Sequence, residues 1–248
     1  MRESVYKISA LSYSNTYPFV YALQNKYNGQ IGELKFEVPA VSVERFKKGE
    51  VDVALVPVGS LPLLKDYNII TDYCIGSYGK VKTVSLFSDV PLDQITEIYL
   101  DSESRSSVKL VKILARDLWH IAPRWQNFDS KANPVYRRSV VLIGDKTFGM
   151  DKRYKFNFDL SEQWLKLTGL PFVFAVWVAR PDVDKGFIAE LNSSFAFGLE
   201  NINKLYDSFL LKISKEEFED YLRNYIDYSF DASKKEAMNK FLELSKGF

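Results

Sequence analysis

Short apolar or alternating runs recur along the chain and are separated by segments of helical periodicity. The runs typical of β-strands are Tyr6–Leu11, Leu34–Pro39, Val51–Val58, Val81–Phe87, Glu97–Leu100, Ser139–Ile143 and Pro171–Ala179. Strands that alternate with helices form βαβ units, in which the strands run parallel and the helices cover both faces of the sheet. The pattern therefore predicts an α/β protein with a mainly parallel sheet.

Helices are predicted where apolar positions recur every three to four residues. The first is expected to begin at Pro18, because proline suits the first position of a helix. This places Asn15 just before the N-terminus of that helix. The second helix covers Ser106–His120, and its apolar face carries Leu110, Val111, Leu114 and Leu118.

After Ala179 the pattern changes to a helical tail. Capping boxes support two helix starts, Ser214 with Glu217 and Ser233 with Glu236. No Gly/Ser-rich or Pro-rich linker separates two sequential domains, so a two-lobed chain would have to cross between its lobes through strand-like segments. The expected tail helices are Val183–Leu205, Ser214–Tyr228 and Ser233–Lys246, and the best candidates for the crossovers are Val81–Ser88 and Pro171–Arg180.

Composition narrows the class of partner. Hydrophobic residues make up 46% of the chain and aromatic residues 15%, which supplies a core and argues against disorder. The 33 basic residues nearly balance the 32 acidic ones, so no electrostatic feature favours a nucleic acid or an anionic membrane as the partner. A small molecule is the expected ligand. No feature of the sequence indicates an oligomeric state.

Cysteine, histidine and N-terminal residues limit the chemistry and the location. Cys74 and His120 are the only residues of their types, so an intramolecular disulfide and the usual zinc clusters are excluded, and neither a metal nor a cofactor is expected. Near the N-terminus, Arg2, Glu3 and Lys7 interrupt any apolar signal-peptide core, and no later run is long enough to span a membrane. We expect a cytoplasmic protein.

Six short blocks, in this order along roughly residues 5 to 180, resemble the chorismate dehydratase family of the futalosine route to menaquinone. Each block is weak alone, and the last is the most distinctive. Three positions depart from the family pattern with small side chains: Ser14, Thr83 and Ser106. The blocks are Ser12–Pro18, Asp52–Val58, Gly79–Val84 with Leu86–Ser88, Leu100–Asp101 with Ser104–Ser107, Ile143–Lys146, and Thr168–Trp177.

The resemblance implies the two-lobed fold of type II periplasmic binding proteins, with a ligand cleft between lobes that each contain a mainly parallel sheet flanked by helices. It places residues 1–85 and 180–248 in lobe 1 and residues 86–179 in lobe 2. It also implies an enzyme, a hydro-lyase that converts chorismate to 3-[(1-carboxyvinyl)oxy]benzoate and water. On this fold, ligand binding is expected to draw the two lobes together.

The same resemblance assigns residues to the site. Asn15 is expected to orient the substrate in catalysis, and the expected substrate-binding residues are Ser14, Thr83, Ser106, Ser107, Gly144 and Asp145. Local chemistry offers plainer roles: Asn15 as a turn residue, the serines as helix caps and Asp145 as a loop residue. The start of a helix can also bind a carboxylate, since its N–H groups are unpaired.

The remaining candidates are expected to be structural. His120 ends an amphipathic helix, where histidine commonly contacts the terminal carbonyls. Cys74 is expected to be a buried strand residue rather than a nucleophile. The tryptophans are expected in the core or between the lobes, at Trp119, Trp125, Trp164 and Trp177.

The matched blocks contain no obvious protein base. We therefore expect the enolpyruvyl carboxylate of chorismate to accept the C3 proton, held in reach by Asn15. Three alternatives remain. A 1,4-dihydroxy-6-naphthoate synthase of the same pathway would need a histidine base, and only His120 is present. A non-catalytic receptor for small carboxylates would need export, and the effector module of a transcription regulator would need a preceding helix-turn-helix.

Overall fold

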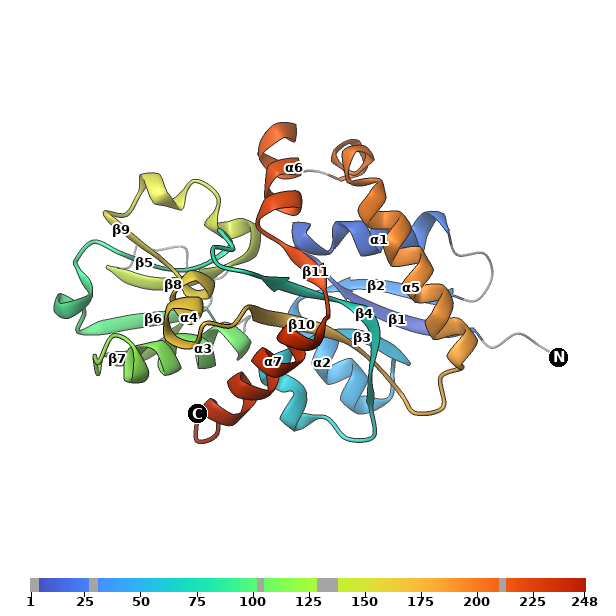
Figure 1. Ribbon diagram of the computed structural model, residues 1–248, viewed down its shortest axis with the longest axis horizontal. Helices are drawn as coiled ribbons and strands as arrows, with labels where there is room; N and C mark the ends of the chain where they lie inside the picture. Colours follow the sequence, from blue (N-terminus) through green and yellow to red (C-terminus); the bar gives the residue numbers. More distant parts are fainter. Residues whose placement is uncertain (1–4, 27–30, 102–104, 129–137, 210–212) are drawn as a thin grey trace.

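The computed structural model describes residues 5–26, 31–101, 105–128, 138–209 and 213–248, which form two lobes, each built on one sheet (Figure 1). The strands are β1 (Tyr6–Leu11), β2 (Ile31–Glu37), β3 (Val53–Pro57), β4 (Asn68–Ser77), β5 (Val84–Ser88), β6 (Glu97–Asp101), β7 (Arg124–Phe128), β8 (Ser139–Ile143), β9 (Phe156–Asp159), β10 (Phe172–Ala179) and β11 (Asp227–Ser229). The helices are α1 (Tyr17–Asn25), α2 (Pro39–Lys48), α3 (Arg105–Asp117), α4 (Leu160–Thr168), α5 (Lys185–Glu200), α6 (Lys215–Asn224) and α7 (Ala232–Leu244).

The two sheets confirm the predicted two-lobed α/β class. In lobe 1 the described strands follow the order β11-β4-β10-β3-β1-β2, and in lobe 2 the order β7-β6-β8-β5-β9. The parallel core of lobe 1 is β2-β1-β3, and that of lobe 2 is β7-β6-β8. Strands β10 and β5 pair antiparallel with both of their neighbours. Each sheet is therefore mixed rather than mainly parallel, because the strand that follows each crossover enters it in the opposite direction.

The crossovers overlap only the first residues of the segments expected to contain them, Val81–Ser88 and Pro171–Arg180. The chain passes from β4 to β5 through residues 78–83 and returns from α4 to β10 through residues 169–171. Strand β10 pairs with β3 and β4 and is buried along its whole length. Residues 172–179 therefore belong to the sheet of lobe 1, whereas the expected boundary placed them in lobe 2. This placement gives the apolar run of β10 a strand on either side.

Helices cover both faces of the lobe 1 sheet, with α1 and α5 on one face and α2 and α7 on the other (Figure 1). Between α1, α5 and β10, the rings of Phe19, Phe195 and Trp177 lie 4.6 to 5.8 Å apart and are fully buried. Such pairs add about 0.5–1.5 kcal/mol each beyond the burial of their area. Trp177 and Trp164 are core residues as predicted. Cys74 is a buried residue of β4, and burial raises the pKa of its thiol.

The tail departs from the prediction in two places. Ser214 caps α6 by accepting the N–H of Glu217 at 3.2 Å, as predicted. The next helix is capped by Asp231, which accepts the N–H of Lys234 at 2.9 Å, so the box predicted at Ser233 is wrong. Residues 227 and 228, predicted as the end of a helix, belong to β11 because β4 has a free edge to pair with. At the end of α3, His120 Nδ1 lies 3.2 Å from the Arg116 carbonyl, the helix-end contact that was predicted.

A buried carboxylate fixes the first crossover. Asp159, at the start of α4, accepts the N–H groups of Val81 and Lys82 at 2.9 and 2.7 Å through one oxygen. Its other oxygen accepts two N–H groups of the first turn of α4, at 3.1 Å each. Lys82 has a left-handed φ of 68°, a conformation that costs a non-glycine residue about 1–3 kcal/mol. The hydrogen bonds to Asp159 hold the backbone in this shape.

The burial of Asp159 predicts how stability depends on pH. Burial raises the pKa of Asp159 from its ordinary 3.8 to about 6, so the folded protein keeps this proton where the unfolded chain has lost it. The resulting contribution to stability is fully present below pH 3.8 and is lost as the pH rises through about 6. Relative to Asp159→Asn, the wild-type protein should lose about 2 kcal/mol of unfolding free energy between pH 4 and pH 7.

Chemical denaturation of the two proteins across this range measures the effect. Asp184→Asn, which alters the exposed cap of α5, is the control and should follow the wild-type profile. A constant difference between wild type and Asp159→Asn at every pH would contradict the prediction.

Candidate functional site

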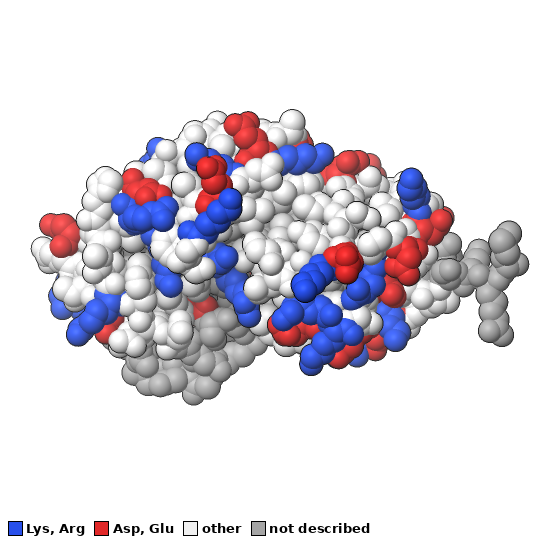
Figure 2. Space-filling view, turned by 90° about the horizontal axis from the view of Figure 1, so that it is seen from below, with Lys and Arg blue, Asp and Glu red and all other residues white. Residues whose placement is uncertain are grey.

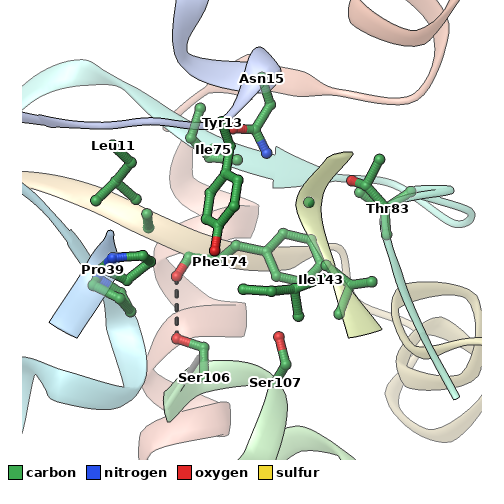
Figure 3. A pocket seen from close by; sticks show the side chains of 15 residues that line it. Leu11, Tyr13, Asn15, Pro39, Ile75, Thr83, Ser106, Ser107, Ile143 and Phe174 are labelled. Atoms are coloured by element: carbon green, nitrogen blue, oxygen red, sulfur yellow. Dashed lines mark hydrogen bonds between the residues drawn. The ribbon is translucent and has the colours of Figure 1, made fainter. Parts of the chain in front are cut away.

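A cavity of about 510 Å³, partly open to solvent, lies where the two lobes meet (Figure 3). This volume includes space that is open to solvent. Its walls come from the ends of β1, β3 and β8, from the first crossover, from β4 and β10, and from the first turns of α2 and α3. The described lining residues are Leu11, Tyr13, Asn15, Pro39, Pro57, Ile75, Val81, Thr83, Val84, Ser106, Ser107, Ile143, Gly144, Phe174 and Ala175.

The structure brings most of the predicted site residues together. Those that line the cavity are Asn15, Thr83, Ser106, Ser107 and Gly144. The two that do not line it are Ser14 and Asp145. Within the fourth motif, Ser104 lies outside the described residues. The predicted residues from Asn15 to Gly144 therefore converge on one place, although they are spread over 130 residues and both lobes.

Local hydrogen bonds present Asn15 to the cavity. A short 3₁₀ turn, Ser14–Thr16, follows β1, and the Thr16 hydroxyl donates to the carbonyls of Leu11 and Tyr13 at 2.5 and 2.7 Å. The Tyr228 hydroxyl donates to the Asn15 carbonyl at 2.9 Å. The turn is thereby held from both sides, and the Asn15 amide points into the cavity (Figure 3).

Ser14 and Asp145 join the lobes instead of facing the cavity. The Ser14 hydroxyl donates to Asp145 Oδ1 at 2.5 Å, and its backbone N–H lies 3.3 Å from both carboxylate oxygens. Burial raises the pKa of Asp145, and the hydrogen bonds from Ser14 oppose this rise. Ser14 is fully buried, and its hydroxyl is engaged by Asp145. Neither residue lines the cavity, and their expected substrate-binding roles stay predictions.

The start of α3 presents two hydroxyls with different surroundings. Ser106 Oγ accepts the N–H of Gly59 at 3.0 Å and donates to the Phe174 carbonyl at 3.2 Å, so this side chain of lobe 2 bonds the backbone of lobe 1. The Ser107 hydroxyl is directed into the cavity (Figure 3). Because the first turn of a helix carries partial positive charge and unpaired N–H groups, this wall favours an anion.

Two tyrosines of the site were not predicted from the sequence. Tyr221 of α6 is fully buried, and its hydroxyl lies 2.7 Å from Thr83 Oγ1. Burial raises the pKa of its phenol, and hydrogen bonding with the side chains of Thr83 and Asn15 opposes this rise. Tyr13 lies within the first motif, and its ring crosses the cavity (Figure 3). The only signal for Tyr221 in the sequence was an apolar position on a helix, which is also the signal of an ordinary core residue.

No acidic, basic or histidine side chain is among the described residues that line the cavity. His120 lies at the exposed end of α3, outside this set. No group of three or more His, Cys, Asp or Glu residues in the described part of the chain is arranged to hold a metal ion. The polar groups available to a ligand are therefore hydroxyls, an amide and backbone N–H groups, which suit a ligand rich in oxygen acceptors.

The outer surface carries no dominant charge on the face seen from below, where basic and acidic side chains are interspersed over both lobes (Figure 2). This agrees with the formal net charge of +1. Among the described helices, none has the length and hydropathy needed to cross a membrane.

Gly144 allows Tyr13 to pack against the opposite lobe, which predicts the effect of adding one methyl group. A Cβ at Gly144 would lie 2.5 Å from Tyr13 Cδ1, and the residue has a left-handed φ of +62°. Gly149 has a similar φ of +75° but no atom within 4 Å of its Cβ position. Gly149→Ala should therefore cost only the backbone strain, about 1–2 kcal/mol of unfolding free energy.

Gly144→Ala should cost about 1–3 kcal/mol more than Gly149→Ala, because the tyrosine ring must also move. Chemical denaturation of both variants gives the difference. Equal losses would mean that the Tyr13 ring is not held against Gly144.

The chain matches a known protein family and is similar to a protein of known name. The sequence profile of a family described as menaquinone biosynthesis matches residues 6–246. A chorismate dehydratase from Thermus thermophilus is 27% identical over 197 residues, which covers 69% of this chain and 70% of that protein.

Solved structures resemble the chain over nearly its full length. A protein from Archaeoglobus fulgidus has a TM-score of 0.76 at 14% identity, with 97% of this chain and 96% of that chain covered. The periplasmic aliphatic sulphonate binding protein from Escherichia coli has a TM-score of 0.68 at 13% identity, with 98% and 87% covered. These similarities confirm the periplasmic-binding-protein-like fold. With the family match over almost all of its length, the chain belongs to the menaquinone biosynthesis family.

Proposed function

We propose that this protein is a chorismate dehydratase, which converts chorismate to 3-[(1-carboxyvinyl)oxy]benzoate and water. Membership of the menaquinone biosynthesis family and the distant chorismate dehydratase homologue support this assignment. The observation that carries it is the composition of the cavity, whose described lining has hydroxyls and an amide but no side chain that could act as a base near neutral pH. Such a site fits a reaction in which the substrate supplies its own base.

The reaction needs one proton transfer and the loss of one hydroxyl. The C3 proton moves to the enolpyruvyl carboxylate, and its electron pair is shared with the ring and the ring carboxylate. The C4–O bond then breaks, and the departing hydroxyl takes up the proton to leave as water. The aromatic ring that forms drives the reaction, so the protein has to position the groups and stabilise the charge that develops on the ring carboxylate.

The cavity offers a binding group for each carboxylate. The Ser107 hydroxyl and the N–H groups at the start of α3 bind the ring carboxylate, where the partial positive charge of the helix stabilises the developing anion. Asn15 and Thr83 lie across the cavity from Ser107 (Figure 3), and they bind the enolpyruvyl carboxylate and hold it near C3.

The absence of lysine and arginine from the described lining fits this division of roles. A cation next to the enolpyruvyl carboxylate would lower its pKa, and a carboxylate of lower pKa accepts a proton less readily. Neutral donors orient the same group with a smaller loss of basicity. A site that used a protein base would have no such constraint.

The rival reaction, that of a 1,4-dihydroxy-6-naphthoate synthase, is less well supported. It was expected to need a histidine base, and the single histidine, His120, contacts the carbonyl of Arg116 outside the cavity lining. Turnover of a cyclic futalosine derivative, but not of chorismate, would favour this rival.

The proposal predicts that Asn15→Ala lowers kcat/KM for chorismate by about 100-fold, because a loosely held carboxylate rarely reaches the C3 proton. Mass spectrometry follows the reaction as the loss of one water from chorismate. The matched control is Asn25→Ala, which removes an exposed asparagine of the adjoining helix α1 and should leave the rate unchanged. A wild-type rate in Asn15→Ala would remove Asn15 from the mechanism, and tight chorismate binding without product would indicate a receptor.

A further inference from the structure

The hydroxyl of Tyr221 lies behind the cavity and connects two of its polar groups. It is 2.7 Å from Thr83 Oγ1, and hydrogen bonding with the Asn15 side chain lowers the pKa of the Tyr221 phenol against the larger effect of burial. Thr83 belongs to the first crossover and Asn15 to lobe 1. Tyr221 is fully buried, so these two side chains are the partners on which its hydroxyl depends. A buried hydroxyl whose hydrogen has no acceptor would cost about 1–3 kcal/mol.

The orientation of Asn15 sets the direction of these hydrogen bonds. Figure 3 shows the amide nitrogen of Asn15 on the side of Thr83 and its oxygen on the side of Tyr13. An amide nitrogen is only a donor, so Asn15 donates to the Tyr221 oxygen. The hydrogen of Tyr221 is then donated to Thr83 Oγ1. The hydrogen of Thr83 itself is left for a group in the cavity, and that group must be an acceptor.

Neighbouring contacts hold Tyr221 in place. One residue before it, Asp220 forms an ion pair with Lys82 at 3.0 Å, and the Lys82 ammonium lies 3.7 Å from the ring centre of Tyr225. The Tyr221 ring packs edge-on against Phe148 of lobe 2, with ring centres 5.5 Å apart. Helix α6 is therefore fixed to the crossover at the level of Thr83, while the tyrosine reaches both lobes.

We propose that Tyr221 is a positioning residue of the active site, which fixes the Asn15 amide and turns the Thr83 hydroxyl hydrogen toward an anionic acceptor of the ligand. The identity of that acceptor, the enolpyruvyl carboxylate, rests on the proposed function. The direction of the hydrogen bonds from Asn15 through Tyr221 to Thr83 does not rest on the proposed function. Tyr221 contacts no substrate atom and acts through the other two residues.

Tyr221→Phe tests this inference, because it removes the hydroxyl and keeps the ring. We expect kcat/KM for chorismate to fall about 10- to 100-fold, as small misplacements of orienting groups do. The control is Tyr206→Phe, which removes a hydroxyl that donates to the Ile213 carbonyl at 3.0 Å, on a ring packed against Phe218 of α6. It should lower the melting temperature by a similar amount and leave kcat/KM unchanged.

A double-mutant cycle separates positioning from a general loss of stability. Because part of the effect of Tyr221→Phe passes through Thr83, adding Tyr221→Phe to Thr83→Val should lower kcat/KM by a smaller factor than it does in the wild-type protein. Independent effects would multiply. A multiplied effect, or a wild-type kcat/KM in folded Tyr221→Phe, would overturn the inference.

Crystal structures of Tyr221→Phe and Tyr206→Phe test the inference without turnover. The Asn15 amide should rotate or shift in the first and stay in place in the second, and an unmoved amide in Tyr221→Phe would count against positioning. If the wild-type protein does not dehydrate chorismate, the proposed function fails, and the position of Asn15 in these structures still decides the role of Tyr221.

Discussion

The carboxylate of Asp159 accepts four backbone N–H groups at the point where the chain passes between the lobes. Two of them belong to the first crossover and two to the first turn of α4, whose other end leads into the second crossover, so one side chain links the elements of both passages. The left-handed backbone of Lys82 depends on it, and the next residue is Thr83 of the cavity wall. Burying a carboxylate is costly, as the raised pKa of Asp159 shows. By fixing the first crossover, Asp159 also fixes the cavity wall at Thr83 relative to both lobes.

Around the cavity, the two lobes are connected by hydrogen bonds. Ser14 with Asp145, and Ser106 with the backbone at Gly59 and Phe174, all connect lobe 1 to lobe 2. These contacts are short-ranged and directional, so they hold one relative placement of the lobes and break over a small separation. Any change in the relative placement of the lobes would therefore change the hydrogen bonding of the cavity wall.

The sequence was informative where a residue's role is local. The motif around Asn15, the start of α3 and the cap at Ser214 depend on neighbours in the chain, and these could be predicted. The mixed sheets and the place of β10 could not, because an apolar run does not indicate the direction in which it pairs. The role of Tyr221 in the site could not be predicted for a related reason. Its partner Thr83 is 138 residues away, and nothing in the periodicity of an amphipathic helix distinguishes a hydroxyl with a specific partner from a core ring.

The place of β10 also has a consequence for the order of assembly during synthesis. Lobe 2 is continuous in the chain from β5 to α4, so it can fold soon after it leaves the ribosome. Strands β3 and β4, although made earlier, are separated in the finished sheet by β10. They stay incomplete until residues 172–179 emerge, and the site must wait for Tyr221 still later. The N-terminal half of this protein is thus synthesised first and finished last, which leaves the apolar strands of lobe 1 dependent on protection from aggregation for most of translation.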